Sequence, residues 1–196
     1  MPRTRILGTH PAGFLLVVIL AAGVVSGAKR NGLATPAVDA ANEAAAPSAG
    51  EIAAIVFAAN TIEIENAELA VAKTNNFEVR DFADRMIVQH RSFNAMAADL
   101  TRRLGLVPKP SPTSLQLAHD AEVTRAILGT KDGAEFDRAY IDSEVAYFQA
   151  VIELLDETII PGAGNAGLMD LLVGMRPTLI QHLDHAKAIQ AELIAS

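Results

Sequence analysis

The side chains in this chain that could carry out chemistry are carboxylates and imidazoles that recur along helix-forming segments. The set consists of Glu63, His90, Glu144, His182 and His185. Each of the first four stands three, four or seven residues from apolar residues of its own segment, which places it on or beside the inward face of a helix. Metal sites in helix bundles are built from carboxylates and imidazoles of facing helices. The five residues are therefore candidate ligands of a single transition metal ion, namely iron, copper or zinc.

The alternative to a metal site is a structural role for the same side chains. A glutamate and a histidine on adjacent helices can pair with each other, and a residue on the flank of an apolar stripe can keep part of its hydration. Burial of these groups without a partner costs several kcal/mol. They therefore require each other, water or a metal ion, and the sequence leaves the choice open.

A di-iron centre is disfavoured by the residues that precede the histidines. Such a centre uses Glu-x-x-His on two helices, but Ile87 stands three residues before His90 and Leu179 three before His182. A softer ion could use Met86, which lies one turn from His90 on the same face, although Met86 also suits core packing. The chain has no nucleophile elbow and no glycine-rich phosphate loop, so we expect a protein that is not an enzyme and has no organic cofactor.

The elements that must position these residues are predicted by hydrophobic periodicity. Apolar residues at steps of three and four predict helices over residues 51–74, 79–104, 114–128, 134–158 and 165–195. The second helix has a strict heptad seam, consisting of Val79, Phe82, Met86, Gln89, Phe93, Met96 and Leu100. No strand pattern is present. The sequence predicts an all-α fold: an antiparallel four-helix bundle with an extra short helix between its second and third helices.

The first 28 residues have the organisation of a secretion signal. Arg3 and Arg5 precede an apolar run over residues 14–25, and Ser26-Gly27-Ala28 follows. The run is shorter than the roughly 20 residues that span a bilayer, so we expect cleavage; an uncleaved membrane anchor is the alternative. Residues 29–50 are predicted to be a disordered spacer, and residues 51–196 the folded domain. The protein is therefore expected to be periplasmic or secreted, with no membrane span after cleavage.

Charge and cysteine content exclude other classes of partner and site. The formal charge is −7, and it falls to −9 without residues 1–28, which carry two cations and no acid. A domain this acidic repels phosphate backbones, so nucleic-acid binding is not expected. The chain has no cysteine, which excludes disulfides and thiolate metal sites. A protein partner in the cell envelope is compatible with this composition, and the oligomeric state is left open.

Three segments of the chain resemble the DUF4142 domain family. The first runs from Glu63 to His90, the second from Phe136 to Tyr147, and the third from Arg176 to Lys187, and the resemblance covers about residues 51–194. It implies an exported bacterial protein with a ferritin-like fold and no agreed biochemical activity. The expected function is thus a binding or stress-related role in the envelope, without catalysis. The alternative is a ferritin-like transition-metal-binding protein with its site in the bundle core.

The chain also departs from the pattern of this family at three positions. Members typically carry aspartate where Gln89 stands, and many have histidine in place of Ser143 and of Phe148. If those histidines bind a ligand in relatives, this chain has lost up to two of them. The five candidate ligands still match the family pattern.

Overall fold

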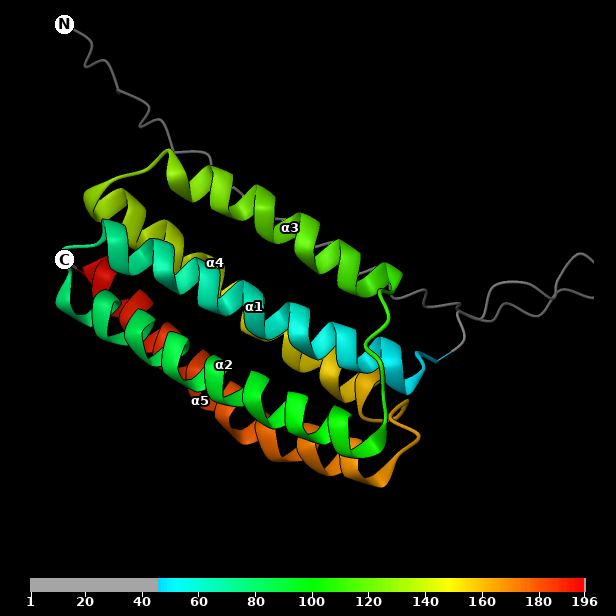
Figure 1. Ribbon diagram of the computed structural model, residues 1–196. Coiled ribbons are helices and arrows are strands. Elements are labelled where there is room, and N and C mark those ends of the chain that lie inside the picture. The colour runs from blue at the N-terminus through cyan, green and yellow to red at the C-terminus, as the bar shows by residue number, and fades with distance from the viewer. Residues whose placement is uncertain (1–45, 196) are drawn as a thin grey trace, which may run out of the picture.

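The computed structural model describes residues 46–195, and all of the regular structure within that range is helical. Its elements are α1 (Ala49–Lys73), α2 (Phe77–Leu104), α3 (Pro112–Gly129), α4 (Gly133–Leu154), the π-helix η1 (Leu155–Ile159) and α5 (Ala166–Ala195) (Figure 1). The all-α prediction is confirmed. The expected signal over residues 1–28 and most of the expected spacer lie outside the described residues.

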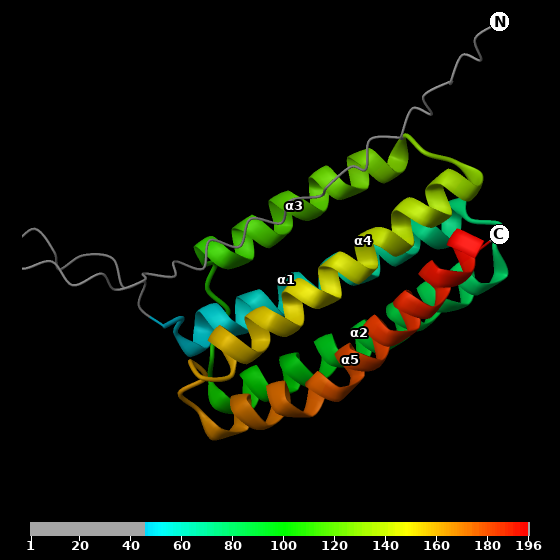
Figure 2. The same ribbon diagram turned by 180° about the vertical axis from the view of Figure 1, so that it is seen from behind.

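Four of the helices, α1, α2, α4 and α5, form the bundle, and α3 packs on its outside against α1 and α4 (Figures 1 and 2). Each helix runs antiparallel to the one before it in sequence. Because α3 carries the chain back along the bundle, α4 starts at the same end as α2 and runs in the same direction. One long crossover therefore connects the second and third helices of the four-helix bundle. The predicted short helix is thus an 18-residue crossover.

The helix starts are fixed by capping side chains. Ser48 and Glu51 form a capping box, so α1 begins at Ala49, two residues before the predicted start and inside the expected spacer. The side chain of Asn76 accepts hydrogen bonds from two backbone amides at the start of α2. A second capping box, with Pro112 in the first turn, begins α3.

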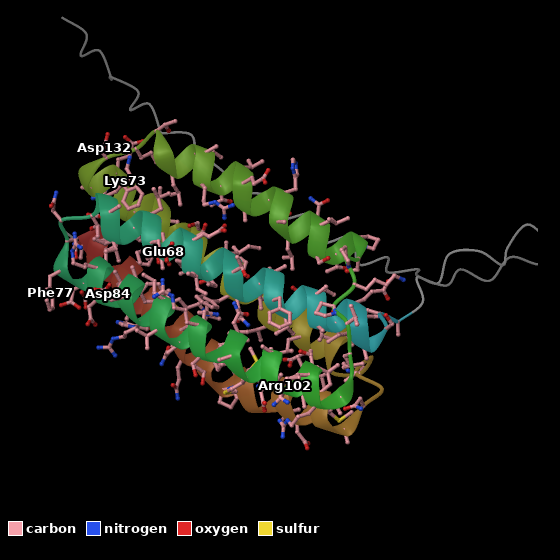
Figure 3. All side chains as sticks on the ribbon, viewed as in Figure 1. Glu68, Lys73, Phe77, Asp84, Arg102 and Asp132 are labelled. Atoms are coloured by element: carbon pink, nitrogen blue, oxygen red, sulfur yellow. The ribbon has the colours of Figure 1, made fainter. Side chains whose placement is uncertain are left out.

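The connections hold α3 and the ends of the bundle in place. The Lys73 ammonium donates to the carbonyl oxygen of Gly129 (3.0 Å) and lies 3.1 Å from the carboxylate of Asp132, beside the turn between α3 and α4 (Figure 3). At the other end, the backbone amide of Lys109 donates to the carbonyl oxygen of Gly50 (2.9 Å). A Cβ on Gly50 would lie 2.8 Å from the carbonyl oxygen of Val107, so only glycine permits this close approach.

The buried stripe of α2 departs from the predicted heptad seam. Gln89 and Met96, expected in the seam, are exposed, whereas Ala83, His90 and Ala97 are buried. An α-helix has 3.6 residues per turn, so a stripe that faces a fixed direction drifts away from a strict seven-residue repeat. This drift moves His90 from the expected flank of the stripe into the core, where it is 2% exposed.

Candidate functional site

A pair of carboxyl groups lies in the core between α1 and α4. Glu63 and Glu144 are each 1% exposed, and their carboxyl groups interact. Neither oxygen of Glu63 has a hydrogen-bond partner of good geometry, and Glu144 Oε2 has none either. Burial and the charge of Glu144 raise the pKa of Glu63 well above its ordinary value, and burial raises the pKa of Glu144 to about 7. The protonated forms are therefore favoured in the folded protein.

Two tyrosines of α4 accompany the carboxyl pair. The hydroxyl of Tyr140 is buried without a partner, while that of Tyr147 donates to the carbonyl oxygen of Ala59 (2.9 Å). Burial and the charges of Glu63 and Glu144 raise the pKa of both phenols well above the ordinary value. Both phenols therefore stay neutral and can act as hydrogen-bond donors.

A pair of imidazoles lies between α2 and α5. The rings of His90 and His182 are 5.3 Å apart between centroids, at an interplanar angle of 48°. His90 Nδ1 is 2.9 Å from the side-chain oxygen of Asn60 on α1. His182 Nε2 contacts the side-chain oxygen of Gln89, one residue before His90 on α2. Each ring is thus held at one nitrogen by an amide oxygen.

The other nitrogen of each ring is free. Burial, with the nearby His182 as a second cause, lowers the pKa of His90 to about 3; burial and then His185 lower that of His182 to about 4. Both rings are therefore neutral near pH 7 and carry one proton each. An amide oxygen only accepts, so the proton stays on His90 Nδ1 and on His182 Nε2. His90 Nε2 and His182 Nδ1 are left with lone pairs and no partner.

The two pairs occupy adjacent layers of the bundle. Asn60 precedes Glu63 by three residues on α1, and Phe148 follows Glu144 by four on α4, so the layers are separated by about one turn, roughly 5 Å. The ring of Phe148 lies 6.1 Å from that of His90 and 5.2 Å from that of His182. Phe148 thus completes the wall around the imidazoles.

The structure therefore brings the predicted ligands together in two pairs. His185 belongs to neither pair, because its half-buried ring packs on Phe82 with a centroid distance of 5.3 Å. Across residues 46–195, no three or more His, Cys, Asp or Glu side chains are grouped so that they could hold a metal ion. A site that uses all five predicted ligands at once does not exist in this arrangement.

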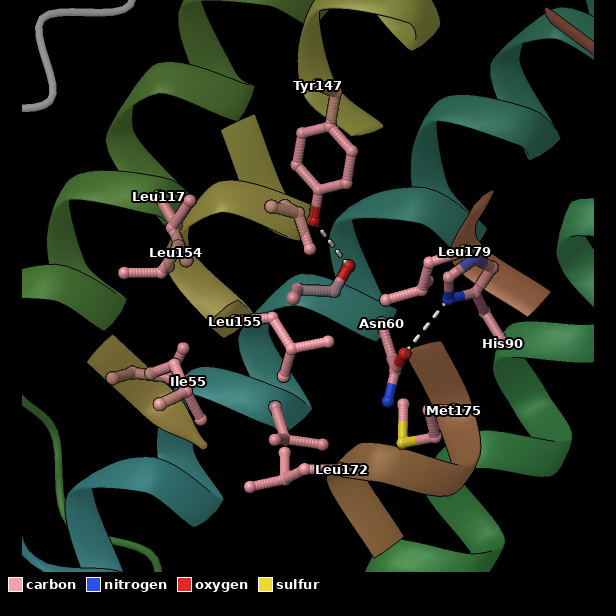
Figure 4. Close-up of a pocket in the computed structure, with 14 residues that line it drawn as sticks. Ile55, Asn60, His90, Leu117, Tyr147, Leu154, Leu155, Leu172, Met175 and Leu179 are labelled. Carbon is pink, nitrogen blue, oxygen red and sulfur yellow. Dashed lines mark hydrogen bonds between the residues drawn. The ribbon is translucent and has the colours of Figure 1, made fainter. Parts of the chain in front are cut away.

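A cavity of about 50 Å³ adjoins the imidazole layer, with His90 and Asn60 in its wall (Figure 4). The remaining wall is apolar apart from Tyr147 and includes Leu155 and Ile159 of η1. The amide of Ile160 donates to the carbonyl oxygen of Leu155 (2.9 Å), a bond across five residues that widens the helix there. The space suffices for a few water molecules or a small ligand.

The family of this chain is decided by comparison with protein-family models. The model described as domain of unknown function DUF4142 matches residues 34–189. The chain belongs to the DUF4142 family. The match begins within the expected spacer and confirms the resemblance seen in the three sequence segments. None of the curated proteins compared with the chain matches it.

A solved structure supports the fold of this DUF4142 domain. It is the crystal structure of a DUF305 protein from Streptomyces coelicolor that is predicted to be secreted, with a TM-score of 0.61 and 15% sequence identity. The alignment covers 74% of this chain and 94% of the other. At this identity the similarity establishes the helical fold alone. Among the described helices, none is long and apolar enough to cross a membrane.

The three departures from the family pattern now have structural roles in this DUF4142 domain. Gln89 orients His182, and Phe148 packs against both imidazoles. Ser143 is half-buried, and its hydroxyl donates to the carbonyl oxygen of Tyr140 (2.6 Å). Two of the three departures therefore fall at the imidazole pair.

Asn60 was missed as a site residue. Asn60 is not among the candidate ligands predicted from the sequence, but it is 2% exposed and orients His90. A signal was present, because Asn60 stands four residues after Val56 and seven before Ala67, both of which are buried. Its contact with His90, 30 residues away, could not be read from spacing within one helix.

Proposed function

We propose that this DUF4142 domain is an exported, non-enzymatic protein that binds a ligand inside its helical bundle. One observation carries the proposal: buried polar atoms without hydrogen-bond partners gather in the core. They belong to Asn60, Glu63, His90, Asn94, Tyr140, Glu144 and His182. Buried polar groups in folded proteins nearly always have a partner, and each one without costs about 1–3 kcal/mol. A ligand in the core would supply the missing partners.

Export and the absence of catalysis rest on separate support. The charged and apolar organisation of residues 1–28 is that of a secretion signal, and the fold is shared with a DUF305 protein predicted to be secreted. The chain carries no nucleophile elbow or phosphate loop. Glu63, Glu144 and Tyr140 are all buried in the core, which leaves little access for a substrate.

Native mass spectrometry of protein purified from the cell envelope tests this proposal. The expected result is a chain that lacks residues 1–28 and carries a bound non-protein mass, which is released chemically unchanged on denaturation. Ligand binding would be contradicted by a chain that carries no bound mass and in which nuclear Overhauser experiments detect only water next to the core protons. A bound compound that the protein converts into another would contradict the non-enzymatic part.

A second candidate function is that of a ferritin-like transition-metal-binding protein. It is favoured by the stacking of a carboxyl pair on an imidazole pair, with one residue from each helix of the four, and by the crossover topology. In this form of the proposal, iron, copper or zinc binds at one of the two pairs, His90 with His182 or Glu63 with Glu144, because no three of these side chains are grouped around one point.

Elemental analysis of metal-loaded protein tests the metal-binding function. We expect one equivalent of metal, lost in His90→Ala and kept in His119→Ala, because His119 is exposed on α3. Metal at trace level after loading would exclude this second candidate. An unchanged stoichiometry in His90→Ala would show that His90 is not a ligand.

A further inference from the structure

We propose that His90 and His182 form a two-nitrogen site for a soft monovalent cation. Copper(I) is the biological ion of this class, and silver(I) is its redox-stable counterpart. The inference rests on the metal-binding form of the proposed function and narrows it to two imidazoles, without the carboxylates.

The protonation state and the orientation that a metal ion requires are already present at the two free nitrogens. Metal-binding imidazoles usually donate their second ring N–H to an oxygen acceptor, which fixes the tautomer and the ring orientation. Asn60 provides that acceptor for His90, and Gln89 provides it for His182. The remaining nitrogens, His90 Nε2 and His182 Nδ1, are buried and have no hydrogen-bond partner. No proton has to be displaced from either nitrogen.

The separation of the rings suits one ion between them. Two metal–nitrogen bonds of about 2 Å each, together with the radii of the rings, place the ring centres about 6 Å apart in a straight arrangement. The observed 5.3 Å corresponds to a strongly bent one, with an angle of roughly 110–125° at the ion. An ion can lie between the rings in that bent arrangement, whereas a straight one requires the ring centres to move apart by roughly 1 Å.

Further ligands of the kinds that other metals need are lacking. Zinc takes four ligands in a tetrahedral arrangement, and magnesium and calcium take six or more oxygens. In the described part of the chain, no third His, Asp or Glu joins this pair. The rings of Phe93 and Phe148 lie against His90, at centroid distances of 5.6 and 6.1 Å. An ion with a low coordination number and a preference for soft ligands fits such surroundings.

Among the described residues, two methionines place thioether sulfur, a further soft donor, on the helices around the imidazoles. Met86 is buried one turn before His90 on α2, and Met175 lines the cavity together with His90. Met175 and Asn60 both line this cavity (Figure 4). Thioether sulfur favours copper(I) over harder ions.

The apolar surroundings also select the charge of the ion. The free energy needed to move an ion from water into a medium of low polarity rises with the square of its charge. Desolvation of a dication therefore costs roughly four times as much as that of a monocation. Two neutral imidazoles bring no negative charge to offset it. The pair therefore discriminates against zinc(II), iron(II) and manganese(II).

Silver(I) titration of the full mature chain, followed by 15N NMR of the histidine side chains, tests the site. We expect saturation at one equivalent, with His90 Nε2 and His182 Nδ1 shifted and split by coupling to the silver nucleus. X-ray absorption of the copper(I) complex should show two nitrogen neighbours. Silver bound through a single histidine, through other nitrogens or not at all would overturn the proposal.

Variants separate this site from other forms of metal binding. His90→Gln and His182→Gln should weaken silver binding by roughly a hundredfold, and Gln89→Ala, which leaves both rings in place, by about tenfold. His119→Gln, His185→Gln and Glu63→Gln should bind as the parent does. If zinc(II) or iron(II) binds instead and Glu63→Gln abolishes it, the two-nitrogen site is wrong while the metal-binding function stands. If no ion binds, both fail.

Discussion

The carboxyl pair and the imidazole pair are one helical turn apart, yet they differ in their hydrogen-bond partners. Glu63 and Glu144 face each other with three oxygens unpartnered, and burial favours their neutral forms. His90 and His182 are also neutral, but each is fixed by an amide oxygen and presents one lone pair. The carboxyl pair destabilises the fold because its buried oxygens lack partners, whereas the imidazole pair is oriented for a ligand.

The comparison shows that burial alone does not make a binding site. Both pairs are desolvated, and both consist of residue types that bind metals. They differ in the groups that orient them, since Asn60 and Gln89 hold the imidazoles while no side chain holds the oxygens of Glu63. Orientation by neighbouring groups is what commonly accompanies a metal ligand.

The largest expected effect comes from removal of the apolar wall of the imidazole layer. Phe148→Ala should lower the free energy of unfolding by about 4 kcal/mol, because it opens a cavity between His90 and His182. Phe77→Ala is the matched control and should cost almost nothing, since Phe77 is 76% exposed. Urea denaturation measures both. Equal losses in the two variants would show that Phe148 is not part of a packed wall.

The next effect concerns the carboxyl pair. Glu144→Gln should raise the free energy of unfolding at pH 8 by about 3 kcal/mol, because it removes a buried carboxylate whose pKa is raised to about 7 from 4.5. At pH 4 the difference should vanish, since the carboxyl is protonated whether the chain is folded or unfolded. Glu153→Gln, on the exposed side of the same helix, is the control. A loss of stability in Glu144→Gln at pH 8 would mean that the carboxylate has a stabilising partner.

The pH dependence of stability should be dome-shaped, since the two pairs act in opposite directions. Between pH 4.5 and 7 the folded chain binds the proton of Glu144 more tightly than the unfolded chain, so this contribution falls as pH rises. The histidines have folded pKa values of about 3 and 4 against 6.5 unfolded, so their contribution is lost as pH falls below 6.5. Thermal denaturation over pH 4–8 should show both slopes, and Glu144→Gln should flatten the upper one. A parent profile that keeps rising from pH 6.5 to 8 would contradict this assignment.

The smallest effects should separate the two amides that orient the imidazoles. Asn60→Leu should cost about 2 kcal/mol, because it leaves the Nδ1–H of His90 buried without an acceptor. Gln89→Ala should cost about 0.5 kcal/mol, because Gln89 is exposed and water can replace its oxygen. Chemical denaturation at pH 7 compares them. The opposite order would assign the main orienting role to Gln89.

Much of the fold could be predicted from sequence because helix periodicity is a local property. The positions of the five helices followed from apolar spacing, and the three segments that resemble DUF4142 lie along these helices. Two features were not predicted: the capping box of Ser48 and Glu51, which moves the start of α1, and the π-helical turn after α4. The second depends on packing of the whole chain.

The candidate site was predicted less completely, because contacts between helices depend on their rotation. Spacing identified Glu63, His90, Glu144 and His182 as inward residues, and all four are buried. Spacing could not show that they divide into two pairs, or that His185 packs against Phe82. The seven-residue repeat of α2 also misplaced Gln89 in the core, where the actual period of the helix puts His90.

The central claim is that both core imidazoles are neutral and that each has one nitrogen without a proton or a partner, Nε2 in His90 and Nδ1 in His182. 15N NMR of the unliganded chain at pH 7 tests it most directly. The account predicts one protonated nitrogen per ring, Nδ1 for His90 and Nε2 for His182, with no change down to about pH 5. Charged rings at pH 7, or rapid averaging between the two tautomers in either histidine, would contradict it.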